Sequence, residues 1–206
     1  MLYKLAHILR DKMPLMWYLI GYINSFLFRL RYSRYDNAIT EILKKYSDGN
    51  VVKGHHLRFE ALSNDNLCAL AKMFSEQPEN AFDFFHPHEF DCQTLKHLAD
   101  NKSFLAFVVL ADKKAVGYFF QRSFFWGKSF RGYMTDFRWQ RLGINRLMNL
   151  CATEILSLLG LDVFGSISPR NIASMKSAQS ANDIRIIETL DNGDYYVQYL
   201  PKKNLS

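Results

Sequence analysis

The stretch Gln140-Arg141-Leu142-Gly143-Ile144-Asn145 separates a strand-like segment from a helix-like one. Residues 129–137 alternate in the manner of a half-buried strand, and residues 144–156 place apolar side chains at helical spacing. A strand that enters a helix through a short glycine turn leaves backbone N–H groups free at the positive end of the helix dipole. The stretch therefore predicts a site for a phosphate or diphosphate, which Gly143 allows to approach the backbone.

The segments around this turn alternate between the two kinds of periodicity from residue 57 onward. The turn Asp191-Asn192-Gly193-Asp194 indicates a hairpin between the last two strands. The expected strands are 57–62, 104–110, 116–125, 129–137, 162–168, 184–190 and 195–200, and the expected helices are 67–74, 91–99, 144–156 and one that opens after Asn171.

Two short motifs occur at matching places in this order of strands and helices. Gln140 and Gly143 match the Gln-x-x-Gly-x-(Gly/Ala) turn of the Gcn5-related N-acetyltransferases (GNAT), although Asn145 stands where a second small residue is usual. The segment that begins at Asn171, 28 residues after Gly143, resembles the family's Asn-x-x-(Ala/Ser) segment. Together with the element order, the chain resembles this family over roughly residues 55 to 200.

The resemblance implies an α/β (α+β) class, the GNAT acyl-CoA N-acyltransferase fold: a mixed, mostly antiparallel sheet flanked by helices, here with an added N-terminal helical segment. It implies acetyl-CoA as acyl donor and a small-molecule primary amine as acceptor. It also implies that strand 129–137 splays away from strand 162–168, so that its backbone binds the pantetheine arm, and that Arg138, Arg141 or Arg146 adds charge near the diphosphate. The cofactor-binding residues implied are Thr135, Phe137, Gln140, Arg141, Leu142, Gly143, Ile144, Asn145, Asn171 and Ser174.

The catalytic acid departs from the family pattern. Many members carry a tyrosine seven residues after the asparagine, where this chain has Ala178. Tyr133 on the central strand is the first candidate for a substitute acid. Tyr195, Tyr196 and Ser168 are the others.

The loop 82–90 contains His86-Pro87-His88-Glu89, in a region that shapes the acceptor pocket in this family. Imidazole titrates near neutrality, so His86 or His88 is a candidate base for the acceptor ammonium. Binding the substrate or simple packing are the alternatives for both. Glu60 and Asp136 are further candidate bases. We expect no metal, because this pair of histidines lacks matching ligands elsewhere.

Residues 13–28 carry no charge and are bracketed by basic residues. As a helix they extend about 24 Å, short of the roughly 30 Å hydrocarbon layer of a membrane. We expect either a helix lying on a membrane surface or a helix packed on protein, including a homodimer formed through residues 1–35. Residues 36–46 continue as a second helix, and the chain divides into a helical segment 1–50 and an acetyltransferase segment 51–206.

Residues 1–53 hold nine Lys/Arg and four Asp/Glu, so nearly all of the net charge of +6 lies there, and no nucleic-acid partner is expected. The three cysteines lack paired spacing, so we expect Cys68 and Cys151 to be reduced thiols in the core of a cytoplasmic protein. If residues 1–35 contact lipid, we expect the protein to act at the inner face of the membrane. The expected function is N-acetylation of an amine, for example an amino sugar of surface-polysaccharide synthesis. The alternative is a non-catalytic acyl-CoA-binding or sensor module.

Overall fold

The computed structural model describes residues 14–202; residues 1–13 and 203–206, the outer ends of the two predicted segments, lie outside the described residues. Short 3-10 turns occur at Ser33–Tyr35, Glu79–Phe82 and Phe137–Trp139. The helices and strands are α2 (Pro14–Tyr32), α3 (Asp36–Ser47), β1 (Val51–Val52), β2 (His55–Ala61), α4 (Leu67–Ser75), α5 (Cys92–Asp100), β3 (Phe104–Ala111), β4 (Lys114–Ser123), β5 (Lys128–Thr135), α6 (Ile144–Leu159), β6 (Asp162–Ile167), α7 (Ile172–Ala181), β7 (Asn182–Thr189) and β8 (Tyr195–Pro201).

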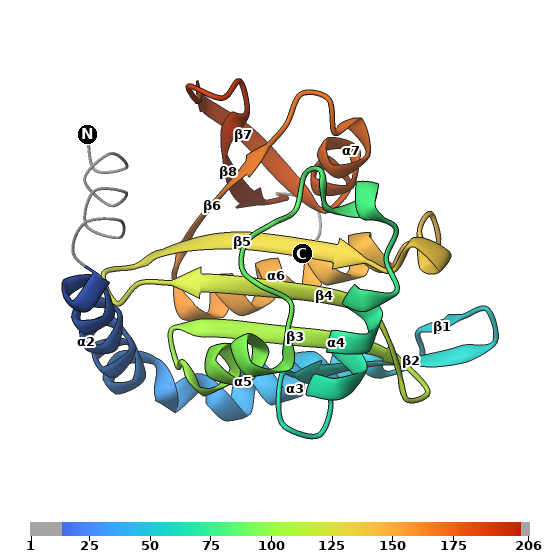
Figure 1. Ribbon diagram of the computed structural model, residues 1–206, viewed down its shortest axis with the longest axis horizontal. Helices are drawn as coiled ribbons and strands as arrows, with labels where there is room; N and C mark the ends of the chain where they lie inside the picture. Colours follow the sequence, from blue (N-terminus) through green and yellow to red (C-terminus); the bar gives the residue numbers. More distant parts are fainter. Residues whose placement is uncertain (1–13, 203–206) are drawn as a thin grey trace.

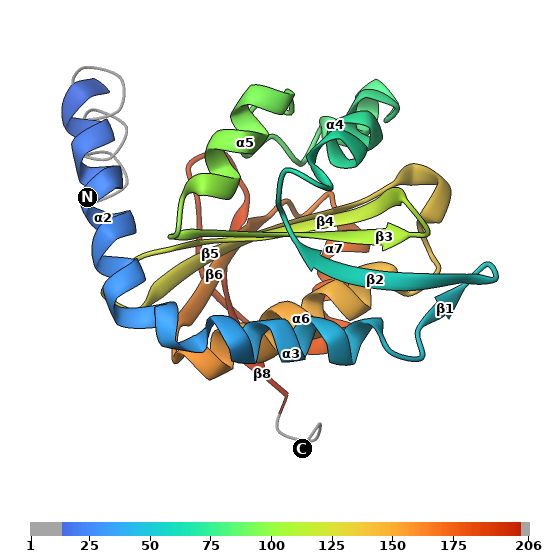
Figure 2. The same cartoon turned by 90° about the horizontal axis from the view of Figure 1, so that it is seen from below.

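Within residues 14–202, eight strands form one sheet in the order β1-β2-β3-β4-β5-β6-β8-β7. Neighbouring strands are antiparallel except for β5 and β6, which are parallel. Helices α4 and α5 cover one face of the sheet, and α3 and α6 cover the other (Figures 1 and 2). This arrangement confirms the predicted fold class, including the added N-terminal helix.

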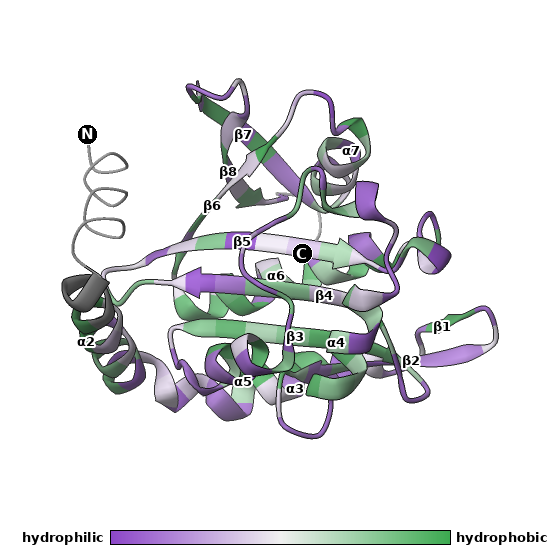
Figure 3. Cartoon of the chain, in the orientation of Figure 1, coloured by the Kyte–Doolittle hydropathy of each residue, from purple (hydrophilic) through white to green (hydrophobic). Residues whose placement is uncertain are grey.

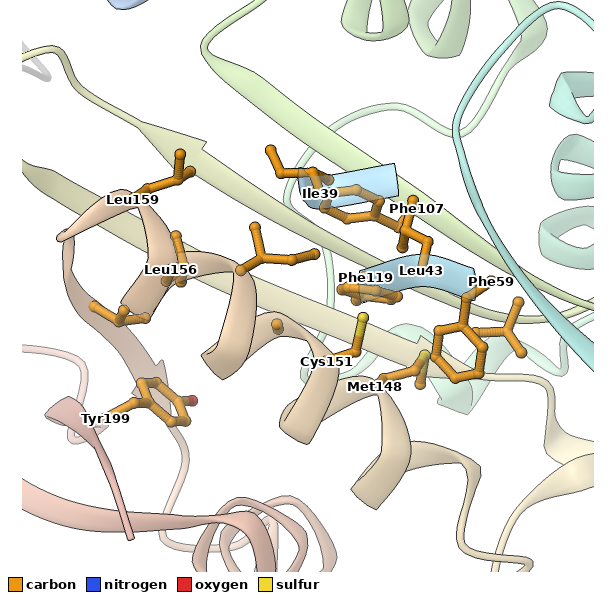
Figure 4. Close-up of a cluster of buried hydrophobic side chains, with 14 of the residues drawn as sticks. Ile39, Leu43, Phe59, Phe107, Phe119, Met148, Cys151, Leu156, Leu159 and Tyr199 are labelled. Carbon is orange, nitrogen blue, oxygen red and sulfur yellow. The ribbon is translucent and has the colours of Figure 1, made fainter. Parts of the chain in front are cut away.

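The core on the α6 side joins side chains from the helices and the sheet (Figure 4). Helix α6 begins after Gly143 and ends at Gly160, both in the left-handed conformation, and the N–H of Gly160 caps the last carbonyls. Between these glycines, Met148, Cys151 and Leu156 are fully buried against the sheet. Burying a side chain of this kind stabilises the fold by about 1.5–3 kcal/mol.

The N-terminal helices pack on the same core. Phe28 and Tyr32 of α2 and Ile39 and Leu43 of α3 are buried with it. Asn24 fixes α2 to the end of β4, because its side-chain amide bonds the carbonyl of residue 123 and the N–H of residue 125 at 3.0 Å each. Residues 19–47 therefore contribute to the hydrophobic core of the sheet.

On the other face, α4 packs Leu70, Met73 and Phe74 against the strands, whose central residues are hydrophobic (green in Figure 3). Cys68 does not join them. The expectation that it is a core thiol is wrong, since it is exposed, whereas Cys151 is buried. Cys68 lies about 100° around the helix from its buried neighbour Leu67, which turns it toward solvent.

Several boundaries differ from those predicted. Strand β5 ends at Thr135 rather than at 137, because the side chain of Asp136 caps a 3-10 turn there. Strand β1 was not predicted; it forms a two-residue pairing with β2 through the turn that contains Lys53 and Gly54, both with positive φ. Helix α2 runs on to Tyr32, beyond the predicted end at 28. Within residues 14–202 no helix combines the length and the hydrophobicity needed to cross a bilayer.

Candidate functional site

Strands β5 and β6 are neighbours only over their first residues. Three parallel pairs join them, from Lys128↔Asp162 to Phe130↔Phe164. Beyond these pairs β6 pairs with β8 alone, and residues 131–135 of β5 face β6 without pairing. The two strands separate, as the family resemblance implies (Figure 1). The register of β5 with β4 is regular, without a bulge.

The backbone of β5 is open on the side of this gap. The N–H of Asp136 donates to the carbonyl of Val116 at 3.0 Å, on the β4 side. Successive residues of a strand direct their backbone groups to alternate sides, so those of Tyr133 and Thr135 point toward the gap. Such an edge can accept an extended chain in the manner of an added strand.

The turn after β5 presents uncovered backbone donors. Gly143 has φ +84° and stands at the start of α6, where no side chain caps the helix. Within residues 14–202 no protein acceptor pairs with the amides of residues 140–143. A Cβ placed on Gly143 meets nothing within 4 Å, so the space above the turn is open. This geometry suits an anion at the positive end of the helix dipole.

Helix α7 packs beside the start of α6. Asn171 caps α7, and its Oδ1 accepts from the N–H of Ser174 at 3.0 Å. Ser177 donates to Asn145 Oδ1 at 2.9 Å, and Asn149 Nδ2 donates to the same oxygen at 2.8 Å. Asn145, the residue that departs from the family turn, thus joins α6 to α7.

A cavity of about 1010 Å³ connects the gap, the turn and the two helices. Its lining includes residues of α6 and α7 on one face of the sheet and of the α4–α5 loop on the other, so it passes between β5 and β6. The predicted site residues that line it are His86, Tyr133, Thr135, Gln140, Arg141, Gly143, Ile144, Asn145, Asn171 and Ser174. His88, Phe137 and Leu142 do not line it.

Phe137 lies outside because the 3-10 turn carries it away from the strand. Its N–H donates to Gln77 Oε1 at 3.0 Å, so this amide is engaged within the chain, which disfavours the expected backbone contact of Phe137 with a pantetheine arm. Leu142 has an exposed side chain, and only its backbone belongs to the turn. Thr135 remains at the gap, and its buried hydroxyl has no partner within the described chain.

His88 packs beside the cavity rather than in it. Its Nδ1 lies 2.7 Å from the carbonyl oxygen of Glu89 and therefore donates, so Nε2 accepts from the hydroxyl of Tyr118 at 2.9 Å. Burial lowers the pKa of His88, which favours the neutral ring. This placement favours the packing alternative for His88.

His86 is exposed and lines the cavity. Its Nε2 lies 3.9 Å from a carboxylate oxygen of Glu89, and its ring meets Phe90 edge-on at 5.6 Å. Of the two histidines, His86 is the one placed to contact a ligand.

Tyr133 directs its hydroxyl to within 3.4 Å of Ser174 Oγ at the start of α7. Ala178, at the position of the usual family tyrosine, lies on the buried side of the same helix and is fully buried. The other candidate acids, Tyr195, Tyr196 and Ser168, do not line the cavity. Tyr133 is therefore the candidate acid that the fold brings to the gap.

Three of the candidate groups are engaged elsewhere. Asp136 is buried, and its carboxylate accepts from the backbone, Nε and Nη2 of Arg138. Burial raises the pKa of Asp136, but these hydrogen bonds outweigh it and leave the pKa lowered. Arg138 also pairs with Glu76 at 2.6 Å. Neither Asp136 nor Arg138 lines the cavity, and the candidate base Glu60 lies outside it too, paired with Arg58.

The sequence did not single out Arg131, which lines the cavity from β5 and is 7% exposed. It donates to Thr153 at 3.0 Å and lies over the ring of Tyr199, 4.7 Å from its centroid. Burial lowers the pKa of Arg131 to about 10, and its Nε has no partner within residues 14–202. The sequence signal that could have identified Arg131 is a basic residue at a position of an alternating strand where the side chain points into the fold.

No group of three or more His, Cys, Asp and Glu side chains suited to a metal ion occurs in the described part of the chain.

No family model and no curated protein matches the sequence. Solved structures do match it. The GNAT domain of S. lividans PAT is 8% identical, with a TM-score of 0.64 over 76% of this chain and 98% of that one. The aminoglycoside acetyltransferase AAC(6')-Ib, with paromomycin and acetyl-CoA, is 10% identical, with a TM-score of 0.57 over 73% and 98%. The PaiA N-acetyltransferase of Thermoplasma acidophilum, with coenzyme A, is 13% identical, with a TM-score of 0.59 over 71% and 99%.

These likenesses span nearly the whole of each neighbour and agree on one architecture. The chain has the fold of the GNAT acetyltransferases, as its motifs and element order predict.

Proposed function

We propose that this chain is an N-acetyltransferase that transfers an acetyl group from acetyl-CoA to the primary amine of a small molecule. One observation carries the proposal: an open strand edge and a turn of uncovered amides line the same cavity, which passes through the sheet. The neighbours with this fold include acetyltransferases solved with acetyl-CoA or coenzyme A.

The residues of the cavity fit the coenzyme. The amides of residues 141–145 and the cations Arg141 and Arg146 suit the diphosphate. The backbone of Tyr133 and Thr135 suits the amides of the pantetheine arm, and the unpaired hydroxyl of Thr135 offers a further hydrogen bond. Acetyl-CoA supplies the acetyl group as a thioester.

The chain contributes position and proton transfer. A backbone N–H of β5 at the gap stabilises the negative charge that develops on the carbonyl oxygen. Tyr133 donates a proton to the departing sulfur, in place of the tyrosine that Ala178 replaces. His86, exposed at the loop end of the cavity, accepts a proton from the acceptor ammonium.

The rival proposal is a module that binds acyl-CoA without transferring the acyl group, and Ala178 is the residue that favours it. Two measurements separate the readings. Acetyl-CoA at a hundredfold excess over its Kd stabilises a binding protein by about 2.7 kcal/mol. Release of free thiol in the presence of amines then identifies an enzyme. Stabilisation without thiol release for any amine supports the sensor, and no stabilisation at millimolar acetyl-CoA contradicts both readings.

The proposed setting is the cytoplasmic face of a membrane, with an amino sugar of surface-polysaccharide synthesis as one acceptor to test. The outer side of α2 over residues 19–32 supports this setting because it is apolar and no side chain of residues 19–202 covers it. Its exposed apolar side chains are Leu19, Ile20, Tyr22, Ile23, Phe26 and Leu30. Exposed Arg29 and Arg34 near its C-terminal end suit anionic headgroups.

A second copy of the chain is the alternative occupant of this surface. Sedimentation with phosphatidylglycerol vesicles, before and after Phe26→Ser and Leu30→Ser, tests the membrane contact. We expect the wild type to sediment with anionic vesicles and the double variant to stay in solution. A wild-type dimer that ignores the vesicles and dissociates in the double variant supports the protein contact instead.

A further inference from the structure

Tyr199 brings a second phenol hydroxyl to the cavity, beside Tyr133. Both residues line the cavity, and Tyr199 lies on β8, which follows β6 in the sheet. Burial raises the pKa of Tyr199 well above its ordinary value, and the neighbouring Tyr133, with which it forms a hydrogen bond, raises it further. A hydrogen bond that raises the pKa of a phenol favours its protonated form. The hydroxyl of Tyr199 therefore donates, and the oxygen of Tyr133 accepts.

A glycine on β6 makes room for this contact. Gly165 is paired with Val197, two residues before Tyr199, so Gly165 and Tyr199 lie on the same face of the sheet. A Cβ placed on Gly165 would lie 3.0 Å from Cε2 and 3.2 Å from the hydroxyl oxygen of Tyr199. Gly165 also follows Phe164, the last residue of β6 that pairs with β5. The ring of Tyr199 thus lies against β6 at the point where the two strands separate.

A buried cation lies behind Tyr199. The guanidinium of Arg131 lies 4.7 Å from the centroid of the Tyr199 ring and donates to Thr153 Oγ1 at 3.0 Å. Its contact with Asn149 Oδ1 is longer, at 3.4 Å. Within residues 14–202 no carboxylate pairs with Arg131. Because the surroundings are buried and these partners are neutral, the charge acts on nearby groups with little screening.

The charge of Arg131 costs stability. Burying a charge without a counterion is unfavourable, and even buried ion pairs are often no more stable than apolar side chains of similar volume. The lowered pKa of Arg131 reflects this burial. Its Nε, and both polar side-chain atoms of its β4 neighbour Gln121, have no partner among the described residues. Packing alone therefore does not account for an arginine at this position.

The proposed reaction develops negative charge beside this arginine. The amine nitrogen bonds to the acyl carbon, the C–S bond breaks, and its electron pair leaves on the sulfur. Tyr133 gives its proton to that sulfur and is a phenolate until a proton released by the acceptor nitrogen replaces it. On its other side Tyr133 meets Ser174 Oγ at 3.4 Å. A phenolate in a buried site needs hydrogen-bond donors and positive charge, which Tyr199, Ser174 and Arg131 are suited to supply.

We infer, resting on the proposed function, that Tyr199 and Arg131 are positioning residues for the acid Tyr133. Tyr199 holds the phenol oxygen of Tyr133 by a hydrogen bond and stabilises the anion that forms there. Arg131 packs on the ring of Tyr199 and supplies the compensating charge. The buried cation thus serves acyl transfer at the expense of stability.

Variants made with and without Tyr133→Phe test this assignment, because residues that act through Tyr133 lose their effect when its hydroxyl is absent. The assay follows thiol release from acetyl-CoA, with hydroxylamine as a small nucleophile in place of the acceptor. We expect Tyr199→Phe and Arg131→Met each to lower kcat by about tenfold, with KM for acetyl-CoA nearly unchanged. In Tyr133→Phe protein the same two changes are expected to lower kcat by less than about twofold.

Urea midpoints separate this role from a structural one. Arg131→Met removes the buried charge and keeps a long side chain, so we expect a midpoint equal to or above that of the wild type despite the lower kcat. Arg131→Lys, which keeps the charge, is expected to restore most of kcat. Tyr46→Phe is the matched control for Tyr199→Phe, because the hydroxyl of Tyr46 donates to Glu154 at 3.1 Å and Tyr46 does not line the cavity.

Three results overturn the inference: full kcat in Tyr199→Phe, losses that are as large in the Tyr133→Phe background, or an Arg131→Met variant that loses stability and kcat together. Each of them leaves the proposed function standing, because the wild type still releases thiol. A wild type that releases no thiol with hydroxylamine or with any amine refutes the proposed function, and the inference with it.

Discussion

Ser177 donates a hydrogen bond of 2.9 Å to Asn145 Oδ1, which joins the first turn of α6 to the middle of α7. The family turn has a small residue at this position, and this chain uses the larger side chain to hold two helices together. Both helices line the cavity, so the bond fixes the relative positions of the uncovered turn and of Asn171.

Ser177→Ala removes this bond. We expect a loss of about 1 kcal/mol in the free energy of unfolding and a several-fold weaker Kd for coenzyme A, because α7 is no longer held against the turn. Ser180→Ala is the control, since the hydroxyl of Ser180 bonds only to the carbonyl of Ser177 within α7. Equal coenzyme affinities for the two variants, measured by calorimetry, contradict the role of this bond.

Gly143→Ala tests the role of the uncovered turn in binding. Gly193→Ala is the control, because Gly193 has the same backbone conformation. Gly143 and Gly193 have φ of +84° and +85°, and an added Cβ meets nothing within 4 Å at either. Backbone strain costs about 1–2 kcal/mol of stability in both variants. Only Gly143→Ala is expected to weaken coenzyme binding, by at least tenfold, since its methyl group stands where the diphosphate approaches. If Gly193→Ala weakens binding as much, the effect comes from stability alone.

Tyr133→Phe removes the proposed acid. We expect kcat/KM for acetyl transfer to fall by about a hundredfold or more, within the range for general acids, while thermal stabilisation by coenzyme A stays within error. Tyr195→Phe, on the last hairpin and away from the cavity, is expected to keep full activity. A Tyr133→Phe enzyme with near wild-type kcat/KM assigns the proton donor to another group.

His88 makes the fold sensitive to acid. Its pKa is lowered in the folded state, so between the folded and the unfolded pKa the unfolded chain binds more protons. The stability that neutral His88 provides is complete above about pH 6.5 and decreases as the pH falls toward the lower folded pKa.

We expect wild-type protein to lose more stability between pH 7.5 and pH 5.5 than His88→Gln, which keeps a donor and an acceptor but does not titrate. Urea midpoints at the two pH values measure the difference. His56→Gln, at an exposed position on β2, serves as the control and should follow the wild type. Parallel losses in wild type and His88→Gln rule out this role.

The element order was predictable because each element leaves a local pattern. Helix α6 begins at Ile144 and strand β3 at Phe104, as expected, since a glycine turn and apolar spacing act over a few residues. The β7–β8 hairpin follows from Gly193 in the same way. The short β1 strand escaped prediction because two residues carry no periodicity.

The site depended on distant contacts. The sequence gives no reason to distinguish His86 from His88. In the fold, His88 contacts Tyr118, whereas His86 lines the cavity. The hydroxyl of Tyr133 lies near Ser174 of α7, and the N–H of Phe137 donates to Gln77. Both contacts join segments that are far apart in the chain.

By itself the sequence determined the alternation of strands and helices and the glycine turn before α6, because backbone conformation responds to neighbouring side chains. The family resemblance already implied that β5 and β6 separate, but only the tertiary structure decided that they do so after three pairs and which side chains meet in the resulting cavity. The reason is physical: strand pairing and burial depend on contacts between residues that are remote in sequence, and no local pattern records them.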